Sequence, residues 1–216
     1  ASGVGETHSA RHILQQAYLV SHSELRMQVV MRMYSQRFGF EPEPGLSLAQ
    51  IRGMEGARVR QAYADASRKY GVPWHGRTLR RDDWDANDSV NQALSAANAV
   101  LHGVCHAAIV SGGYSPALGF LHNGWHLAFV YDIADLYKAN LTIPIAFEIV
   151  ASDSSKVVSR ARQACRENIR EQKLLERILP DIARLLDVPE YSENPQQESG
   201  DRVFEWWEPN VEEDIC

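Results

Sequence analysis

The feature that most constrains the fold is an alanine-rich stretch between Asp88 and Ser111. Asp88 is a favourable N-cap for a helix, and Gly112, Gly113 and Pro116 end the regular pattern. Small side chains along such a helix let neighbouring helices approach closely. We therefore expect a central core helix in this stretch, with other helices packed around it.

Other segments also repeat apolar residues at helical spacing, so we expect further helices on both sides of the core helix. Ser47 is a natural N-cap, and Gly39 and Gly71 are natural stops. The expected helices are Ser9–Val20, Ser23–Phe38, Ser47 to about Tyr70, a helix from about Leu127, Ile143–Ala151, and Ser155–Leu186 with an interruption near Pro180. The predicted fold is mainly α, with a single helical domain over residues 1–188.

The chain of 216 residues is long enough to bury a substantial core. It shows no secretory signal pattern at its start and no run approaching the roughly 18 consecutive apolar residues of a membrane span. Cys105, Cys165 and Cys216 are too few and too scattered for a disulfide framework. We expect a cytoplasmic protein with reduced thiols and no membrane partner.

The formal net charge of −6 conceals two regions of opposite sign. Residues 189–216 carry nine acids and one base, which leaves a slight excess of bases in residues 1–188. The bases of this domain gather in two clusters, which either form solvated helix faces or bind nucleic acid. The first comprises Arg52, Arg58, Arg60, Arg68, Lys69, Arg77, Arg80 and Arg81, and the second Lys156, Arg160, Arg162, Arg166, Arg170, Lys173 and Arg177.

The stretch from Gly119 to Asp135 is apolar but contains His122, Asp132 and Asp135. Two structures are compatible with it. In a hairpin turning at residues 123–124, a strand would carry Asp132 on the order of 20 Å away from His122. In a helix that begins near residue 127, Asp132 and Asp135 share one face. We expect the helix.

Glu55 lies on the apolar stripe of its helix, where an unpaired carboxylate is costly. It either pairs with Arg52 or Arg58 or binds a cation, while Asp132 and Asp135 could be helix caps or surface acids. His122 taken alone could be a loop histidine bonded to backbone. Together, two or three carboxylates and one imidazole suit Mg²⁺ or Mn²⁺.

A zinc site is the rival metal hypothesis. His102, Cys105 and His106 lie within about one helical turn, and the two histidines share a face. The stretch lacks the glutamate of an HExxH motif, and no second ligand pair is suitably spaced, so packed core histidines are favoured. The P-loop, GxGxxG and GxSxG motifs are also absent, which argues against nucleotide hydrolysis and serine-esterase chemistry.

Several ordered motifs resemble a known family. They are Glu55 in EGARVR, His122 in GYSPALGFLH, the aspartates of VYDIAD ten and thirteen residues later, PIAFEI at 144–149 and RQACR at 162–166. From about residue 8 to residue 185 the chain resembles the CRISPR-associated spacer-acquisition integrases, the universal endonucleases of CRISPR adaptation, in their type I-E branch.

The resemblance implies an α-helical catalytic domain in which Glu55, His122 and Asp135 hold Mg²⁺ or Mn²⁺, with Asp132 nearby. It implies insertion of foreign DNA into a CRISPR array by attack of a 3′-hydroxyl on a phosphodiester. Arg58, Arg162 and Arg166 are the expected contacts to double-stranded DNA, both the protospacer and the leader–repeat. Trp125 and His126 stand where some relatives have Lys-Pro, so loop contacts to DNA are expected to differ.

The resemblance also implies partners. Family members carry an N-terminal β domain that contributes to dimerisation, and this chain is expected to begin after it. Residues 189–216 are expected to form a disordered acidic tail whose Phe204, Trp206 and Trp207 dock on the small dimeric companion protein of the adaptation complex or fold back on the body. The alternative function is a catalytically silent DNA-binding scaffold.

Overall fold

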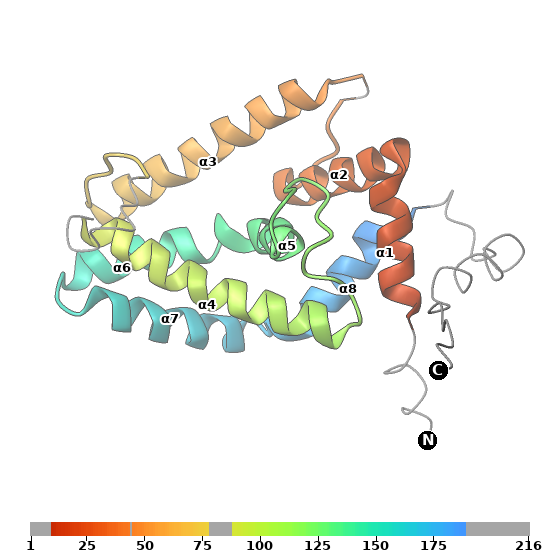
Figure 1. Ribbon diagram of the computed structural model, residues 1–216. Coiled ribbons are helices and arrows are strands. Elements are labelled where there is room, and N and C mark those ends of the chain that lie inside the picture. Colours follow the sequence, from red (N-terminus) through yellow and green to blue (C-terminus); the bar gives the residue numbers. More distant parts are fainter. Residues whose placement is uncertain (1–9, 44, 78–87, 189–216) are drawn as a thin grey trace, which may run out of the picture.

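The computed structural model describes residues 10–43, 45–77 and 88–188, and every regular element in these ranges is an α-helix (Figure 1). The prediction of a mainly α fold is therefore confirmed. The helices are α1 (Arg11–Ser21), α2 (Ser23–Phe38), α3 (Leu48–Tyr70), α4 (Ser89–Ser111), α5 (Ala128–Lys138), α6 (Thr142–Ser152), α7 (Val157–Glu171) and α8 (Leu174–Leu186).

The ends of α3 follow directly from the local sequence. The Ser47 hydroxyl accepts a hydrogen bond from the Gln50 backbone N–H, and the Gln50 side chain accepts one from the Ser47 N–H. This capping box satisfies donors that the first turn of a helix leaves free. At the other end Gly71 adopts φ +67°, a left-handed conformation that costs glycine little.

Helix α4 is the centre of the fold, as its small side chains predict. It packs against α5, α6, α7 and α8, and runs alongside α7 in Figure 1. An 18-residue window of α4 has a mean hydropathy of 1.5, so the helix is long and apolar enough to cross a membrane by length and composition. The position of α4 between other helices accounts for its apolar character, because its side chains are buried against neighbours on several sides.

Two apolar cores meet along α4. Its N-terminal half, with Ala93 and Leu94, packs with side chains of α3, α6 and α7. Its C-terminal half, with Leu101 and Ile109, packs with α1, α2, α5 and α8. Helices α3, α6 and α7 also contribute buried side chains to both cores, so the two halves of the molecule are joined through several helices around α4. Helix α2 contacts both α3 and α5, and these three helices meet at the boundary between the halves.

The expected interruption near Pro180 is wrong. The break lies earlier, between Glu171 and Leu174, where Lys173 adopts a left-handed conformation with φ +50°. Pro180 lies inside α8 on its exposed side. Proline lacks one backbone N–H, and loss of that single bond does not end α8 because its other face buries Ile178 and Ile182 in the core.

The stretch around His122 forms a loop followed by α5, so the helical alternative is confirmed and the hairpin is not formed. Gly124 adopts φ +76° in the turn. Gly119 is required for close packing, because a Cβ there would lie 2.4 Å from the His122 carbonyl oxygen and 2.8 Å from the Ala128 Cβ. The loop thus folds back tightly against the start of α5.

Candidate functional site

Asp132, on α5, organises the loop that carries His122. Its carboxylate is fully buried and accepts hydrogen bonds from the backbone N–H groups of Phe120, Leu121 and His122 at 2.6, 3.1 and 3.1 Å. The His122 ring adds a fourth contact, with Nδ1 2.7 Å from Oδ1. Asp132 is neither a surface acid nor a cap of α5, because its acceptor positions are used to hold the loop.

This contact also sets the orientation of His122. Since a carboxylate only accepts hydrogen bonds, the Nδ1 atom carries the proton and the neutral ring keeps a lone pair on Nε2. The hydrogen bond to Asp132 raises the pKa of His122 above its usual value, against the opposing effect of burial. Carboxylate–histidine pairs of this kind orient metal-binding histidines in proteins.

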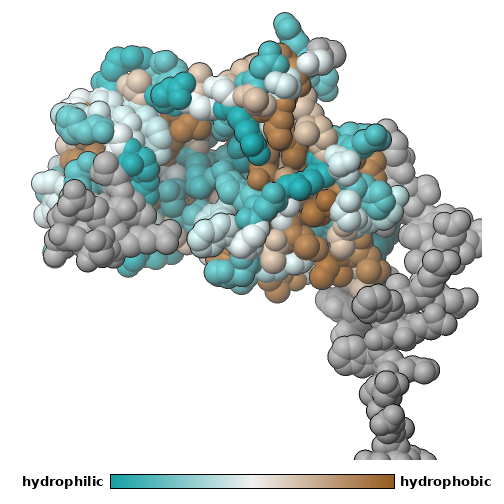
Figure 2. Space-filling model, turned by 45° about the horizontal axis from the view of Figure 1, so that its top comes forward, coloured by the Kyte–Doolittle hydropathy of each residue, from teal (hydrophilic) through white to brown (hydrophobic). Residues whose placement is uncertain are grey.

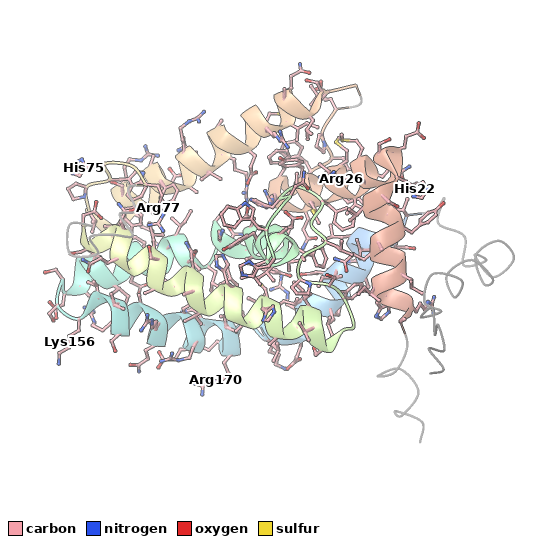
Figure 3. The ribbon with its side chains drawn as sticks, viewed as in Figure 1. His22, Arg26, His75, Arg77, Lys156 and Arg170 are labelled. Carbon is pink, nitrogen blue, oxygen red and sulfur yellow. The ribbon has the colours of Figure 1, made fainter. Side chains whose placement is uncertain are left out.

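Arg26, on α2, supports the same loop from outside. Its guanidinium donates two hydrogen bonds to the Phe120 carbonyl, at 2.9 and 2.7 Å, and one to the Asn123 side chain at 2.6 Å. In Figure 3 Arg26 lies beside the loop that precedes α5. The loop is therefore fixed both by a buried carboxylate and by a cation.

Glu55 and Asp135 face a common cation that the sequence did not predict. The Arg37 Nη1 lies 3.7 Å from Glu55 Oε1, and its Nη2 lies 3.4 Å from Asp135 Oδ2. The Arg37 side chain is only 5% exposed, and its Nη2 also donates to the Asp132 carbonyl at 3.4 Å. Glu55, at 14% exposure, is thus held in a largely buried ion-pair network between three helices.

Two further cations complete this network. Arg58 Nη1 lies 3.8 Å from Glu55 Oε1, so the ion pair considered from the sequence is present. Lys138 Nζ lies 2.5 Å from Asp135 Oδ1. In the part of the chain that the structure describes, no hydrogen bond or ion pair joins α3 to α5 directly. Arg37 is the link between the two carboxylates.

The described residues contain three buried side-chain nitrogen or oxygen atoms without a hydrogen-bond partner, and all lie at the corner where α2, α3 and α5 meet, or beside it. They are Arg37 Nε, Glu55 Oε2 and His102 Nε2. His102 packs edge-on against Tyr131, whose ring also contacts His122. Burial, and to a lesser degree the charge of Lys138, lowers the pKa of His102 to about 4, so its ring is neutral near pH 7.

This donor set fits a hard divalent cation. Among the described residues, Glu55 Oε2 is a buried acceptor without a donor, and the His122 ring forms its hydrogen bond through Nδ1 and not Nε2. Both oxygens of Asp135 already attract cations. These donors do not converge on one point: within residues 10–43, 45–77 and 88–188 no group of three or more such side chains is close enough to hold a metal ion. That result also covers the zinc alternative, in which His106 is exposed.

The predicted DNA contacts Arg162 and Arg166 lie elsewhere. Both are exposed on the outer face of α7, which lies on the opposite side of α4 from α3 in Figure 1. Arg170 continues this row and points away from the bundle in Figure 3. The structure therefore separates these arginines from Glu55, whereas Arg58 lies within the site. Phe204, Trp206 and Trp207 fall outside the described residues.

The sequence offered a partial indication of the missed residues. Arg37 occupies the apolar stripe of its helix with Val29, Val30 and Met33, where a charged residue needs a partner. Lys138 follows Asp135 by three residues, a spacing at which helical side chains meet. Neither pattern reveals that both cations share one carboxylate, because that depends on how α2 crosses α5.

Comparison with known proteins gives concordant results. Residues 6–174 match the family model described as CRISPR associated protein Cas1. The chain is 50% identical over 212 residues to CRISPR-associated endonuclease Cas1 2 of Thermus thermophilus, covering 96% of this chain and 65% of that protein. It is 44% identical over 179 residues to CRISPR-associated endonuclease Cas1 of Escherichia coli, covering 82% and 58%.

Two solved structures are similar in both sequence and fold. The crystal structure of a TtCas1–DNA complex superposes with a TM-score of 0.80 at 52% identity, covering 87% of this chain and 70% of that one. A crystal structure of TtCas1 gives a TM-score of 0.78 at 49% identity, covering 87% and 71%. The chain spans about two thirds of the length of its curated relatives, 65% for the Thermus protein.

Proposed function

Since the chain belongs to the Cas1 family of CRISPR-associated proteins, we propose that it forms the catalytic domain of a metal-dependent DNA endonuclease and integrase of CRISPR adaptation. The observation that carries the proposal is the pair Glu55 and Asp135 around one buried guanidinium, beside an imidazole that Asp132 orients. A protein that only holds DNA has no need of this costly arrangement.

Glu55, His122 and Asp135 would hold Mg²⁺ or Mn²⁺. Carboxylate oxygens and one imidazole nitrogen are compatible with these ions, and Glu55 Oε2 lacks a hydrogen-bond partner among the described residues. When bound, the ion would polarise the scissile phosphodiester and stabilise charge on its oxygens. Asp132 has a positioning part, since it fixes the loop and the tautomer of His122.

The proposed reaction is a transesterification. The 3′-hydroxyl of an incoming fragment attacks a phosphodiester of the CRISPR array, one P–O bond forms and one breaks, and the released strand keeps a new 3′-hydroxyl. The number of phosphodiesters is unchanged, so no nucleotide cofactor is needed. The network around Arg37 would hold Glu55 and Asp135 on one side of the reacting phosphate.

Double-stranded DNA is the proposed substrate, as protospacer and as leader–repeat. The similar TtCas1 protein has been crystallised as a complex with DNA, which supports DNA as the ligand of this chain. Hydrophilic residues gather over the middle of the face shown in Figure 2, while apolar residues gather towards the side of α1 and α2. We propose Arg58 near the site and Arg162 and Arg166 on α7 as contacts to phosphates.

The proposed protein partners are those that the resemblance to the family implies. The full-length protein would form a homodimer and assemble in the cytoplasm with the small dimeric companion protein of CRISPR adaptation. Residues 189–216 would contribute to that assembly through Phe204, Trp206 and Trp207. The proposed branch of the family is type I-E.

Nicking or disintegration of branched DNA tests the function. The activity should require Mg²⁺ or Mn²⁺ and should fall by more than about a hundredfold in Glu55→Ala, because a ligand of the ion is lost. Glu148→Ala is the matched control, since Glu148 is an exposed acid on α6 that forms no ion pair with the described residues. His122→Ala and Asp135→Ala should behave as Glu55→Ala.

The second candidate function, a silent DNA-binding scaffold, makes the opposite prediction. Such a protein would bind branched DNA equally well in all four variants and would not cleave it with any metal. Cleavage that survives in Glu55→Ala would reject the assignment of that residue.

A further inference from the structure

Both oxygens of Asp135 are already occupied by cations of the protein itself. Lys138 Nζ lies 2.5 Å from Oδ1, and Arg37 Nη2 lies 3.4 Å from Oδ2. Glu55 Oε1 likewise faces two arginines, at 3.7 and 3.8 Å. Two carboxylates are therefore surrounded by three positive groups, and a divalent cation has to compete with these groups for the carboxylate oxygens.

The cations around Asp135 differ in their freedom to move. The Arg37 side chain is 5% exposed and is fixed by the Tyr34 ring and the Asp132 carbonyl. The Lys138 side chain is 28% exposed, and Asp135 is its sole hydrogen-bonding partner in the described structure. A lysine is a flexible point charge that can exchange one anion for another, whereas the buried arginine cannot leave without losing its contacts.

We propose that Lys138 is a displaceable counter-ion of Asp135 that makes metal binding depend on the arrival of a DNA phosphate. A phosphate that enters the site attracts the ammonium group of Lys138, which releases Asp135 Oδ1 for the divalent cation. Arg37 stays in place and keeps Asp135 directed towards Glu55. Lys138 is a positioning residue in this scheme, because it acts through Asp135.

This inference rests on the proposed metal-dependent function and adds a thermodynamic coupling to it. If the phosphate removes Lys138 from Asp135, DNA must increase the affinity for the metal, and the metal must increase the affinity for DNA by the same factor. An enzyme built in this way binds its metal tightly only when substrate is present.

The test is a titration with Mn²⁺, followed by electron paramagnetic resonance, with and without a branched duplex that lacks 3′-hydroxyls and so cannot react. Glu55→Ala with the same DNA gives the baseline for Mn²⁺ held by the DNA alone. Wild-type protein should bind Mn²⁺ at least about tenfold more tightly with the duplex, a change of about 1.4 kcal/mol.

Lys138→Met should bind Mn²⁺ about tenfold more tightly than wild type without DNA, and the duplex should then add little. Lys138→Arg restores a cation and should restore the dependence on DNA in part. Lys69→Met is the matched control, because Lys69 is an exposed helical lysine that contacts the Tyr70 ring and pairs with no carboxylate of the described ranges. Thermal unfolding in EDTA verifies that each variant is folded.

Equal or weaker Mn²⁺ binding by folded Lys138→Met without DNA would overturn the inference, even where wild type binds Mn²⁺. A failure of wild type to bind Mn²⁺ above the Glu55→Ala baseline in either condition would overturn the proposed metal-dependent function as well. The two failures are therefore distinguishable.

Discussion

Buried polar groups in the helical bundle differ from those at the corner of α2, α3 and α5. In the bundle, the amide of Gln16 donates to the carbonyls of Ser115 and Leu118 and accepts from the Ser115 N–H. Asp181 accepts from the Tyr137 hydroxyl at 2.6 Å and pairs with Arg184. The side chains of Gln16 and Asp181 therefore find their hydrogen-bond and ion-pair partners within the protein.

At the corner, Arg37, Glu55 and the neighbouring His102 each keep a buried atom without a partner among the described residues. Buried polar atoms in native proteins are nearly always paired, so three exceptions in one neighbourhood need an explanation. A site that receives its partner from outside, as a cation or a phosphate, provides one. The polar groups of the bundle therefore stabilise the fold, whereas those at the corner are available to bind a ligand.

We expect the largest loss of stability when Asp132 is replaced, because its carboxylate, like the polar groups of the bundle, has all its hydrogen-bond partners within the protein. Asp132→Ala leaves three backbone N–H groups of the loop without their acceptor, so we expect a loss of about 3 kcal/mol in the free energy of unfolding. Urea unfolding monitored by circular dichroism measures it. Asp135→Asn is the comparison and should cost about half as much, because asparagine keeps an acceptor oxygen and the Asp135 side chain is 23% exposed to water. Equal losses of unfolding free energy in the two variants would show that Asp132 is no more important for the fold than Asp135.

A second pair of substitutions compares the two regions directly. Gln16→Leu should cost about 2 kcal/mol of unfolding free energy, because several buried backbone groups lose their partner. When the unreactive branched duplex is present, Mn²⁺ should raise the melting temperature of wild type, and Gln16→Leu should leave this rise unchanged. Glu55→Gln should cost about 1–2 kcal/mol, because glutamine keeps an acceptor oxygen beside the buried Arg37, and should abolish that rise. Calorimetric melting with and without Mn²⁺ measures both, and a Mn²⁺ response retained in Glu55→Gln would contradict the assignment.

The contrast also shows what the sequence could predict. Most helix boundaries follow from local chemistry, such as the Ser47 cap and the Gly39 and Gly71 stops, because these bonds form within a few residues. The acidic face of α5 follows from helical periodicity, although a hairpin was equally compatible with the turn residues that precede it. The family could be inferred from several motifs together and not from any one residue.

The ion-pair network could not be predicted in the same way. Arg37 and Asp135 are far apart in the sequence, and their contact depends on the angle at which α2 meets α5. The three hydrogen bonds that the Asp132 carboxylate accepts from backbone N–H groups depend on Gly119. Because Gly119 has no Cβ, the loop can lie close enough to α5 for these bonds to form. Contacts of this kind are set by tertiary packing, and the spacing of residues in the sequence indicates them only weakly.

A third prediction concerns His102 and the pH dependence of stability. The pKa of His102 is about 4 in the folded protein and near 6.5 in an unfolded chain. Between these values the unfolded chain binds a proton that the folded protein does not, so unfolding free energy falls as pH falls. From pH 7 to pH 5 we expect His102 to contribute a loss of about 2 kcal/mol.

Urea unfolding of wild type and His102→Phe at the two pH values isolates this contribution, because other titrating groups affect both proteins equally. The variant should lose less stability on acidification than wild type. An identical loss of unfolding free energy in the two proteins would show that the His102 ring is protonated as easily in the folded protein as in the unfolded chain. His102 would then not count among the side chains with a buried, unpaired polar atom.

The smallest effect on the fold is expected on α7, whose exposed arginines belong to neither class of buried group. Replacing Arg162 and Arg166 together by alanine should change unfolding free energy by no more than about 0.5 kcal/mol. If both neutralise phosphates, the slope of log affinity for duplex DNA against log salt should fall by about two, for unrelated sequences alike. Gln163→Ala, which changes an exposed uncharged residue of the same helix, is the control. An unchanged slope would place the path of the DNA on the side of Arg58 and Lys138, at the corner itself.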